Sequence, residues 1–253
     1  GLVIFDKRSG RFEKMKVDTA QGVAVRSNFI YDLNKFSDGQ IWASSNGGLY
    51  SVDPVTFRTN GYRNHPVLKE IYGKRVLTMY EDRRKRIWLG MGFHGLYCYD
   101  PAQQTLKHYT EKEGIASPTV YAIAEDKQGD IYVATPTGFN IVPQNGPIQK
   151  FTRRNGLRYD RCASVVEDNA GNIWIANNKC LIKYNPINKQ WQYYEDNAGL
   201  SIDGFRVTSF EKAKSGELLL GSQSGINYFY PDQLVTTPSQ LQVSLYSVDI
   251  KDT

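Results

Sequence analysis

The stretch CASVVEDNAGNIW, residues 162–174, returns four more times along this chain at a nearly constant spacing. Its counterparts are IYDLNKFSDGQIW (30–42), VLTMYEDRRKRIW (76–88), VYAIAEDKQGDIY (120–132) and VTSFEKAKSGELL (207–219). The last residues of these segments are separated by 46, 44, 42 and 45 positions. Such a period marks an architecture of repeated supersecondary units, each of which needs neighbours to bury its faces.

Each unit is predicted to form four short antiparallel strands. An inner run rich in β-branched and small residues, such as 120–124, is followed by a turn containing Gly or Asp and by an aromatic-aliphatic strand such as IWIAN (173–177). A third strand opens on a Gly-Leu pair, as in GLYSVDP (48–54), and a polar fourth strand ends most units, as in QWQYYE (190–195). Four strands in about 40–50 residues describe one blade of a β-propeller. The predicted fold class is therefore all-β, a β-propeller of four-stranded blades.

The register of the repeat divides the chain into blades. They fall near 1–28, 29–75, 76–119, 120–161, 162–206 and 207–235, so residues 1–235 are expected to form a propeller fragment. Residues 1–17 match only the third and fourth strands of a blade, and residues 207–231 match only the first three. The fragment is therefore expected to be a partial ring from a longer protein, with further blades upstream; the alternative is that the two partial blades complement each other into a fifth blade. Residues 236–253 are expected to be a linker and the first strand of a following β domain.

Composition disfavours several classes of function. The net charge of +5 is dispersed, whereas nucleic-acid binding favours a concentrated basic stripe. The three cysteines lack CxxC spacing and the three histidines lack metal-ligand spacing, so neither a metal nor another cofactor is expected. No apolar run reaches the length of about 20 residues that a membrane-spanning helix requires.

One known family shares the order of these features. The unit resembles the two-component regulator propeller repeat, best at 165–175 and again at 76–101. The shared features are, in order, an inner strand ending in Glu-Asp, a short turn, Gly-Asn-Ile-Trp-Ile, a Gly-Leu pair, and a Tyr-Asp-Pro or Tyr-Asn-Pro turn. The tail, 225–231 followed by 241–250, resembles the junction to the immunoglobulin-like three-tyrosine domain that follows such propellers. Cys180 replaces a Gly of the repeat, Leu219 replaces a Trp, and 83–85 replace a Gly-containing turn. Because of these departures, no binding residue of the family is carried over.

The resemblance implies a function in signalling. It implies the periplasmic sensor region of a bacterial hybrid two-component histidine kinase in the inner membrane, with a seven-bladed parent propeller. Such a region would bind an oligosaccharide, an acidic one included, and pass the signal to a cytoplasmic phosphorelay. The segment itself would then not be an enzyme. It would dimerise through the parent ectodomain and meet the membrane only through the parent's transmembrane helix.

Candidate binding residues lie on one face of the propeller. Loops that precede the inner strands share this face, the top, with loops that join second and third strands. Arg75, Arg161 and Arg206 directly precede inner strands, which converge on the propeller axis, and are expected to form a partial ring there. Guanidinium groups suit carboxylates, including those of uronic acids. The alternative is that each Arg satisfies carbonyls of a neighbouring loop.

Three further features complete the candidate site. The segment RRNGLRYDR (153–161) adds Arg153, Arg158 and Tyr159, either as an anion-binding surface or as a solvated basic loop. The loop of the second full blade is one residue longer than in the other blades and carries Phe93 and His94, which suit carbohydrate stacking, although a neutral surface insertion is the alternative. Asp32 occupies an inner-strand position held elsewhere by Ala, Ser or Thr, and is expected to pair with Arg75 or Arg206 or to face a wet tunnel.

Two other classes of function stay open. Some propellers cleave glycans with acids around the tunnel, and Asp160 and Asp203 are the available loop acids on the top face. A third class is a protein-interaction or dimerisation module without a small ligand. By contrast, the repeated Asp82, Asp126 and Asp168 are interpreted as turn formers that cap local backbone amides.

Overall fold

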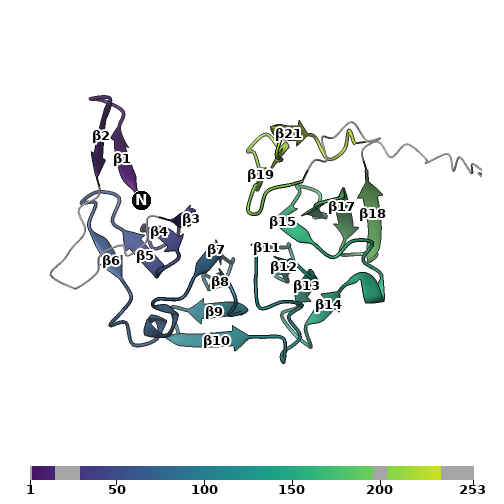
Figure 1. Cartoon of the computed structure of the whole chain (residues 1–253), viewed down its shortest axis with the longest axis horizontal. Coiled ribbons are helices and arrows are strands. Elements are labelled where there is room, and N and C mark those ends of the chain that lie inside the picture. Colours follow the sequence, from purple (N-terminus) through teal and green to yellow (C-terminus); the bar gives the residue numbers. More distant parts are fainter. Residues whose placement is uncertain (1, 15–28, 196–203, 235–253) are drawn as a thin grey trace, which may run out of the picture.

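The computed structural model describes residues 2–14, 29–195 and 204–234. These residues form separate antiparallel sheets that follow one another along an open arc (Figure 1). The expected all-β propeller architecture is confirmed. The strand expected to begin a following domain lies outside the described residues.

Four of the sheets have four strands each. Their strands are β3 (Ile30–Lys35), β4 (Ile41–Ser45), β5 (Gly48–Val52) and β6 (Thr59–Gly61); β7 (Val76–Glu81), β8 (Ile87–Met91), β9 (Leu96–Asp100) and β10 (Thr105–Tyr109); β11 (Ala122–Glu125), β12 (Ile131–Thr135), β13 (Gly138–Val142) and β14 (Gln149–Phe151); and β15 (Cys162–Glu167), β16 (Ile173–Asn177), β17 (Cys180–Asn185) and β18 (Gln190–Tyr194). Within each sheet, strands adjacent in sequence are hydrogen-bonded neighbours. Each sheet is thus a meander with its first strand at one edge.

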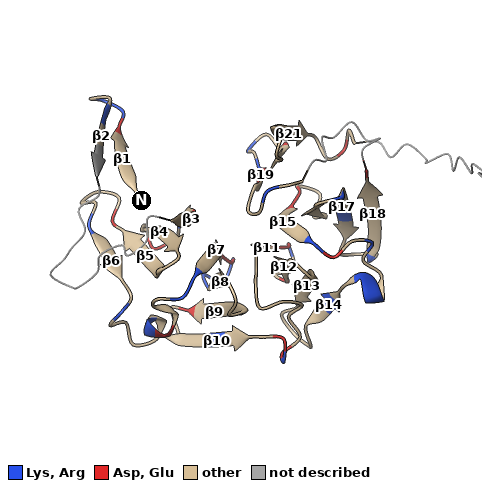
Figure 2. Ribbon diagram, in the orientation of Figure 1, with Lys and Arg blue, Asp and Glu red and all other residues tan. Residues whose placement is uncertain are grey.

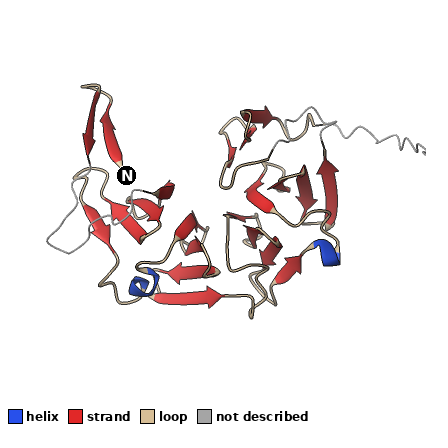
Figure 3. Ribbon diagram, viewed as in Figure 1, coloured by secondary structure: helices blue, strands red, loops and turns tan. Residues whose placement is uncertain are grey.

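The two ends of the arc carry smaller sheets. A hairpin of β1 (Val3–Asp6) and β2 (Arg11–Lys14) lies at one end, and a three-stranded sheet of β19 (Phe210–Lys212), β20 (Leu218–Gly221) and β21 (Ile226–Phe229) lies at the other (Figure 1). Figure 3 shows the predominance of strands, with short 3₁₀ helices in two connections, η2 (Leu68–Ile71) and η3 (Arg153–Asn155). The first strands β3, β7, β11, β15 and β19 line the inner side of the arc.

The hydrophobic core lies between the blades rather than within them. One cluster joins Trp42 and Leu49 of the first full blade to Leu89 and Tyr97 of the next. Similar clusters fill the three following inter-blade spaces. Alternate side chains of a strand point to opposite faces of a sheet, so each blade supplies one wall to the core on either side of it. No blade buries its apolar residues alone.

A carboxylate in the turn after the inner strand fixes each of three blades internally. Asp168 accepts hydrogen bonds of 2.8 Å from the backbone N–H of Asn172 and from the indole Nε1–H of Trp174. The ring contact recurs as Asp82 with Trp88 and Asp126 with Tyr132, each at 2.8 Å. The interpretation of these aspartates as turn formers is confirmed. Each also satisfies a buried ring donor six residues further on.

Candidate functional site

The top face is assembled as the repeat predicts. Loops between second and third strands are hydrogen-bonded to segments that precede inner strands. The backbone N–H of Gly92 donates to the carbonyl of Arg75 at 2.9 Å, and the N–H of Arg206 donates to the carbonyl of Gly221 at 3.0 Å. Arg75 and Arg206 therefore lie at the top ends of their blades, as does Arg161, which directly precedes β15.

Two of these arginines lie against aromatic rings. The guanidinium carbon of Arg75 is 5.7 Å from the centre of the Phe93 ring, and that of Arg161 is 5.8 Å from the centre of the Tyr121 ring. Phe93 is 69% exposed, and both arginines are exposed. A guanidinium held over a ring keeps its N–H groups in plane for a carboxylate or hydroxyl, while the free face of the ring can stack on a sugar.

The loop with the extra residue stands at this rim. Phe93 and His94 are both exposed, and the imidazole Nδ1 of His94 donates to the carbonyl of Gly92 at 3.3 Å. Arg75, Phe93 and His94 thus lie together at the top of β7 and β8. Whether they contact a ligand stays a prediction.

In the basic segment 153–161, only Arg161 lies with the arginines that precede the inner strands, and the residues before it lie apart from them. Its helix η3 lies on the outer side of the arc, where Figure 2 shows a basic turn. Arg158 donates to Glu195 Oε1 at 2.6 Å and stacks on the Tyr193 ring at 4.7 Å. Tyr159 packs against the core, and the Arg153 backbone N–H donates to Asp160. The guanidinium of Arg158 is therefore already engaged by Glu195, which follows the outer strand of the next blade.

Of the two expectations for Asp32, the pairing with Arg75 or Arg206 is wrong, and the residue instead lines an axial cavity. Its Oδ2 accepts a hydrogen bond from the backbone N–H of Met79 at 2.9 Å and lies 3.4 Å from the Thr78 hydroxyl. Asn34 donates to the carbonyl of the same Met79 at 3.3 Å. Met79 belongs to the inner strand of the next blade, whose axial edge has no partner strand, so Asp32 and Asn34 together serve both of its backbone groups. Burial raises the pKa of the Asp32 carboxyl, and the Met79 and Thr78 hydrogen bonds oppose this.

A cavity of about 450 Å³ runs along the inner strands below the rim. Its walls come from all five inner strands or their flanks, and include Asp32, Thr78, Ala122, Ser164 and Thr208. At the bottom end it is bordered by Arg83, Glu125, Glu167 and Lys212. The inner strands thus enclose a polar axial space that a small hydroxylated molecule or water can occupy.

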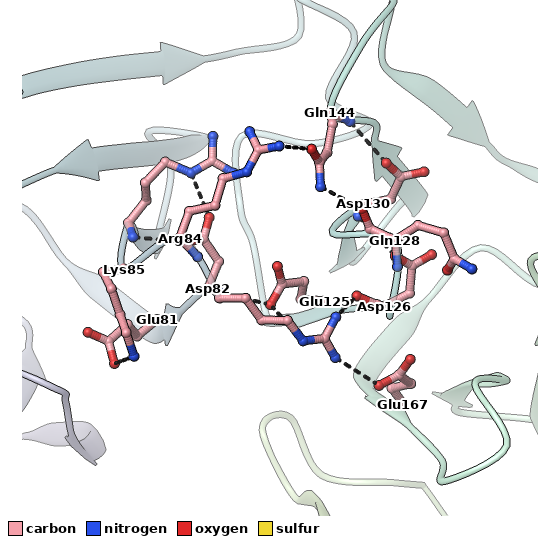
Figure 4. Close-up of polar contacts among 12 residues, drawn as sticks. Glu81, Asp82, Arg84, Lys85, Glu125, Asp126, Gln128, Asp130, Gln144 and Glu167 are labelled. Carbon is pink, nitrogen blue, oxygen red and sulfur yellow. Dashed lines mark hydrogen bonds and ion pairs between the residues drawn. The ribbon is translucent and has the colours of Figure 1, made fainter.

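An ion network at this bottom end escaped the sequence analysis. The Arg83 side chain crosses to the next two blades, donating to the carbonyl of Asp126 and lying 3.4 Å from Glu167 Oε2 and 4.0 Å from Glu125 Oε2 (Figure 4). Burial raises the pKa of the Glu125 carboxyl, and the backbone N–H and charge of Arg83 lower it. The replacement of a Gly-containing turn by 83–85 was the available signal. It marks a link between three blades.

Within residues 2–14, 29–195 and 204–234, no group of three His, Cys, Asp or Glu side chains is placed to hold a metal ion. In that same part of the chain, no helix is long and apolar enough to cross a bilayer.

Residues 114–137 match the family model of the two component regulator propeller. This stretch of the third full blade is therefore similar to a two-component regulator propeller repeat. The resemblance seen in the sequence is thereby confirmed for the propeller, whereas residues 241–250 of the expected junction to a three-tyrosine domain lie outside the described residues. Among curated proteins, histidine kinase P4 of Formosa agariphila is 25% identical over 243 residues, which cover 93% of this chain and 18% of the kinase.

Solved structures share the propeller fold of this chain. An extracellular domain assigned to a hybrid two component system of B. thetaiotaomicron superposes with a TM-score of 0.76 at 22% identity, covering 91% of this chain and 31% of that one. A second such domain from the same organism gives 0.65 at 18% identity, covering 84% and 28%. The chain therefore spans less than a third of the length of these relatives.

Proposed function

We propose that this two-component regulator propeller is part of the extracytoplasmic sensor region of a membrane histidine kinase and binds an oligosaccharide at its top rim. The observation that carries the proposal is the pair of arginine–aromatic contacts, Arg75 with Phe93 and Arg161 with Tyr121. Both stand at the ends of inner strands that lead into the axial cavity. The similar histidine kinase and extracellular domains support a sensor role on the periplasmic side of the inner membrane.

The chemistry of the rim favours sugars that carry a carboxylate. A guanidinium group can bind both carboxylate oxygens at once, and a sugar ring presents C–H groups to an aromatic face. A flat apolar ligand would gain little from the arginines. A small free anion would gain little from the exposed Phe93 ring.

The test is a calorimetric screen of neutral and uronic oligosaccharides. Replacing Arg75 and Arg161 by Ala together should weaken binding by about tenfold or more, because charge-assisted hydrogen bonds are lost. Arg158→Ala is the matched control, since that guanidinium is already engaged by Glu195, and its affinity should equal that of the wild type. Equal loss in all variants, or silence of every oligosaccharide, would refute the proposal.

The alternatives give different outcomes in the same experiment. A glycan lyase or hydrolase would turn over the library and lose turnover in Asp160→Asn, a residue that here accepts a hydrogen bond from the Arg153 backbone. A pure assembly module would dimerise with no dependence on any saccharide. In the sensor proposal, dimerisation belongs to the complete ectodomain and saccharide binding to this rim.

A further inference from the structure

The loop that presents Phe93 has a strained backbone. Phe93 has a φ of 81°, a left-handed conformation that is rare for a bulky residue. Gly95 follows with a φ of 74°, and a Cβ atom there would lie 2.3 Å from the carbonyl oxygen of Tyr109. Such a conformation persists only where surrounding contacts determine it, and such strain clusters at functional sites.

Backbone contacts fix the two ends of this loop. Gly92 donates to the carbonyl of Arg75 at 2.9 Å, and Gly95 donates to the carbonyl of Pro118 at 2.6 Å. A Cβ atom on Gly92 would lie 2.6 Å from Cδ of Arg75, so the glycine makes room for that side chain. Between these ends, Phe93 and His94 project into solvent.

One side chain from the outer strand holds the middle of the loop. His108 Nε2 lies 2.7 Å from the carbonyl oxygen of His94. A carbonyl oxygen only accepts, so Nε2 carries a hydrogen and donates. The imidazole is itself fixed by its cross-strand partner, Tyr97, whose ring is stacked at 4.0 Å and 7°.

The support continues inward from Tyr97. That tyrosine is only 1% exposed, and Lys74 donates to its hydroxyl at 3.1 Å. The pairing of β10, β14 and β18 with their third strands places Lys150 and Tyr193 at the positions equivalent to His108 in the next two blades. Among these three blades, the blade that has His at this position is also the blade that has the longer loop.

We infer that His108 is a positioning residue, which holds the Phe93–His94 loop at the rim in the shape that contacts the ligand. The inference rests on the proposed function for the identity of that contact. The arrangement of the loop itself is independent of any ligand. His108 thus joins the outer strand of the blade to the residues that select the sugar.

A matched pair of variants separates the two contacts of His108. His108→Phe keeps a ring on Tyr97 and removes the donor, whereas His108→Gln keeps an N–H donor and removes the ring. Amide hydrogen exchange of residues 91–95 reports the loop, and exchange of β8 and β9 reports the blade. Titration with trigalacturonate and cellotriose reports binding.

The Phe variant should exchange faster in the loop, with β8 and β9 unchanged. It should bind the preferred trisaccharide about five- to tenfold more weakly, the range expected when one side chain must be ordered on binding. The Gln variant should restore both properties. Unchanged loop exchange in His108→Phe, or failure of His108→Gln to restore it, would overturn the positioning role.

The two proposals fail separately. If the loop loosens as expected but the wild type binds neither trisaccharide, the positioning role stands and the proposed ligand class falls. If the wild type binds and His108→Phe changes neither exchange nor affinity, the ligand class stands and the positioning role falls.

Discussion

The carboxylate oxygen Oδ2 of Asp32 in one blade accepts a hydrogen bond of 2.9 Å from the backbone N–H of Met79 in the next blade. Inner strands face the axis with an unpaired edge, and an unsatisfied backbone N–H is costly when it is removed from water. Asp32 supplies the acceptor and Asn34 the donor for the same residue. The contact therefore links two blades at the axis.

The difference in unfolding free energy between the Asp32→Asn variant and the wild type should depend on pH. Burial raises the pKa of the Asp32 carboxyl, so the folded state binds its proton more tightly and the wild type loses stability as pH rises above the ordinary Asp value of about 3.9. Asn keeps an acceptor for Met79 without the charge. The variant should be more stable than the wild type at pH 7, and the difference should vanish in acid. Urea denaturation between pH 3 and pH 7 measures it.

Asp53→Asn provides a control of opposite sign. Hydrogen bonds from the backbone of Thr56 and Val55 lower the pKa of this exposed carboxyl, so its contribution is present at pH 7 and disappears as pH falls through the folded value. This variant should be the less stable form at pH 7. If the unfolding free energies of Asp32→Asn and the wild type differed by the same amount at every pH, the prediction for the Asp32 carboxylate would be wrong.

Asp168→Ala should destabilise the fold by about 2–4 kcal/mol, because it leaves the buried N–H groups of Asn172 and Trp174 without their acceptor. Denaturant unfolding followed by Trp fluorescence measures the loss. Asp100→Ala is the control, since that carboxylate caps the exposed N–H groups of Ala102 and Gln103, which water can serve instead. Similar losses in both variants would show that the ring contact contributes nothing.

The native chain should be inert to thiol reagents. Cys98, Cys162 and Cys180 are buried, and burial raises the pKa of the Cys98 and Cys180 thiols to about 12. A colorimetric thiol assay at pH 8 should detect no reactive thiol before unfolding and three per chain in denaturant, because the thiolate is the reactive form. Reaction of one equivalent in the native state would show that a blade opens locally.

Gly138→Ala should weaken the third full blade. Gly138 has a φ of 154°, and a Cβ atom there would lie 2.4 Å from the carbonyl oxygen of Phe151 in the outer strand. The expected loss is about 1–3 kcal/mol from backbone strain, measured as a fall in the thermal midpoint. Gly39→Ala is the comparison, because its φ is also positive at 82° but no atom lies within 4 Å of the added Cβ. A smaller loss for Gly138→Ala than for Gly39→Ala would show that the outer strand moves aside.

Part of the site followed from local sequence, and part did not. The repeat placed Arg75 and Phe93 on one face because the direction of a strand fixes the end at which its loops lie. It could not show that Arg158 is bound by Glu195, since Arg158 lies in the connection between β14 and β15, Glu195 follows β18, and the two meet only in the folded chain. Likewise, Arg83 was recognisable as a departure from the repeat, but its acceptors belong to the next two blades.

The sequence by itself determined the blade. The alternation of the strands, the turn residues and the spacing between Asp and Trp all lie within one repeat of about 45 residues, so each repeat encodes its own blade. The tertiary structure decided what each charged side chain binds. Blades meet only at their faces and along the axis, and the partner of a side chain there is set by how neighbouring sheets pack, which no single repeat encodes. Asp32 illustrates the difference: its position on an inner strand was evident from the repeat, but its partner, the Met79 backbone, came only with the adjacent blade.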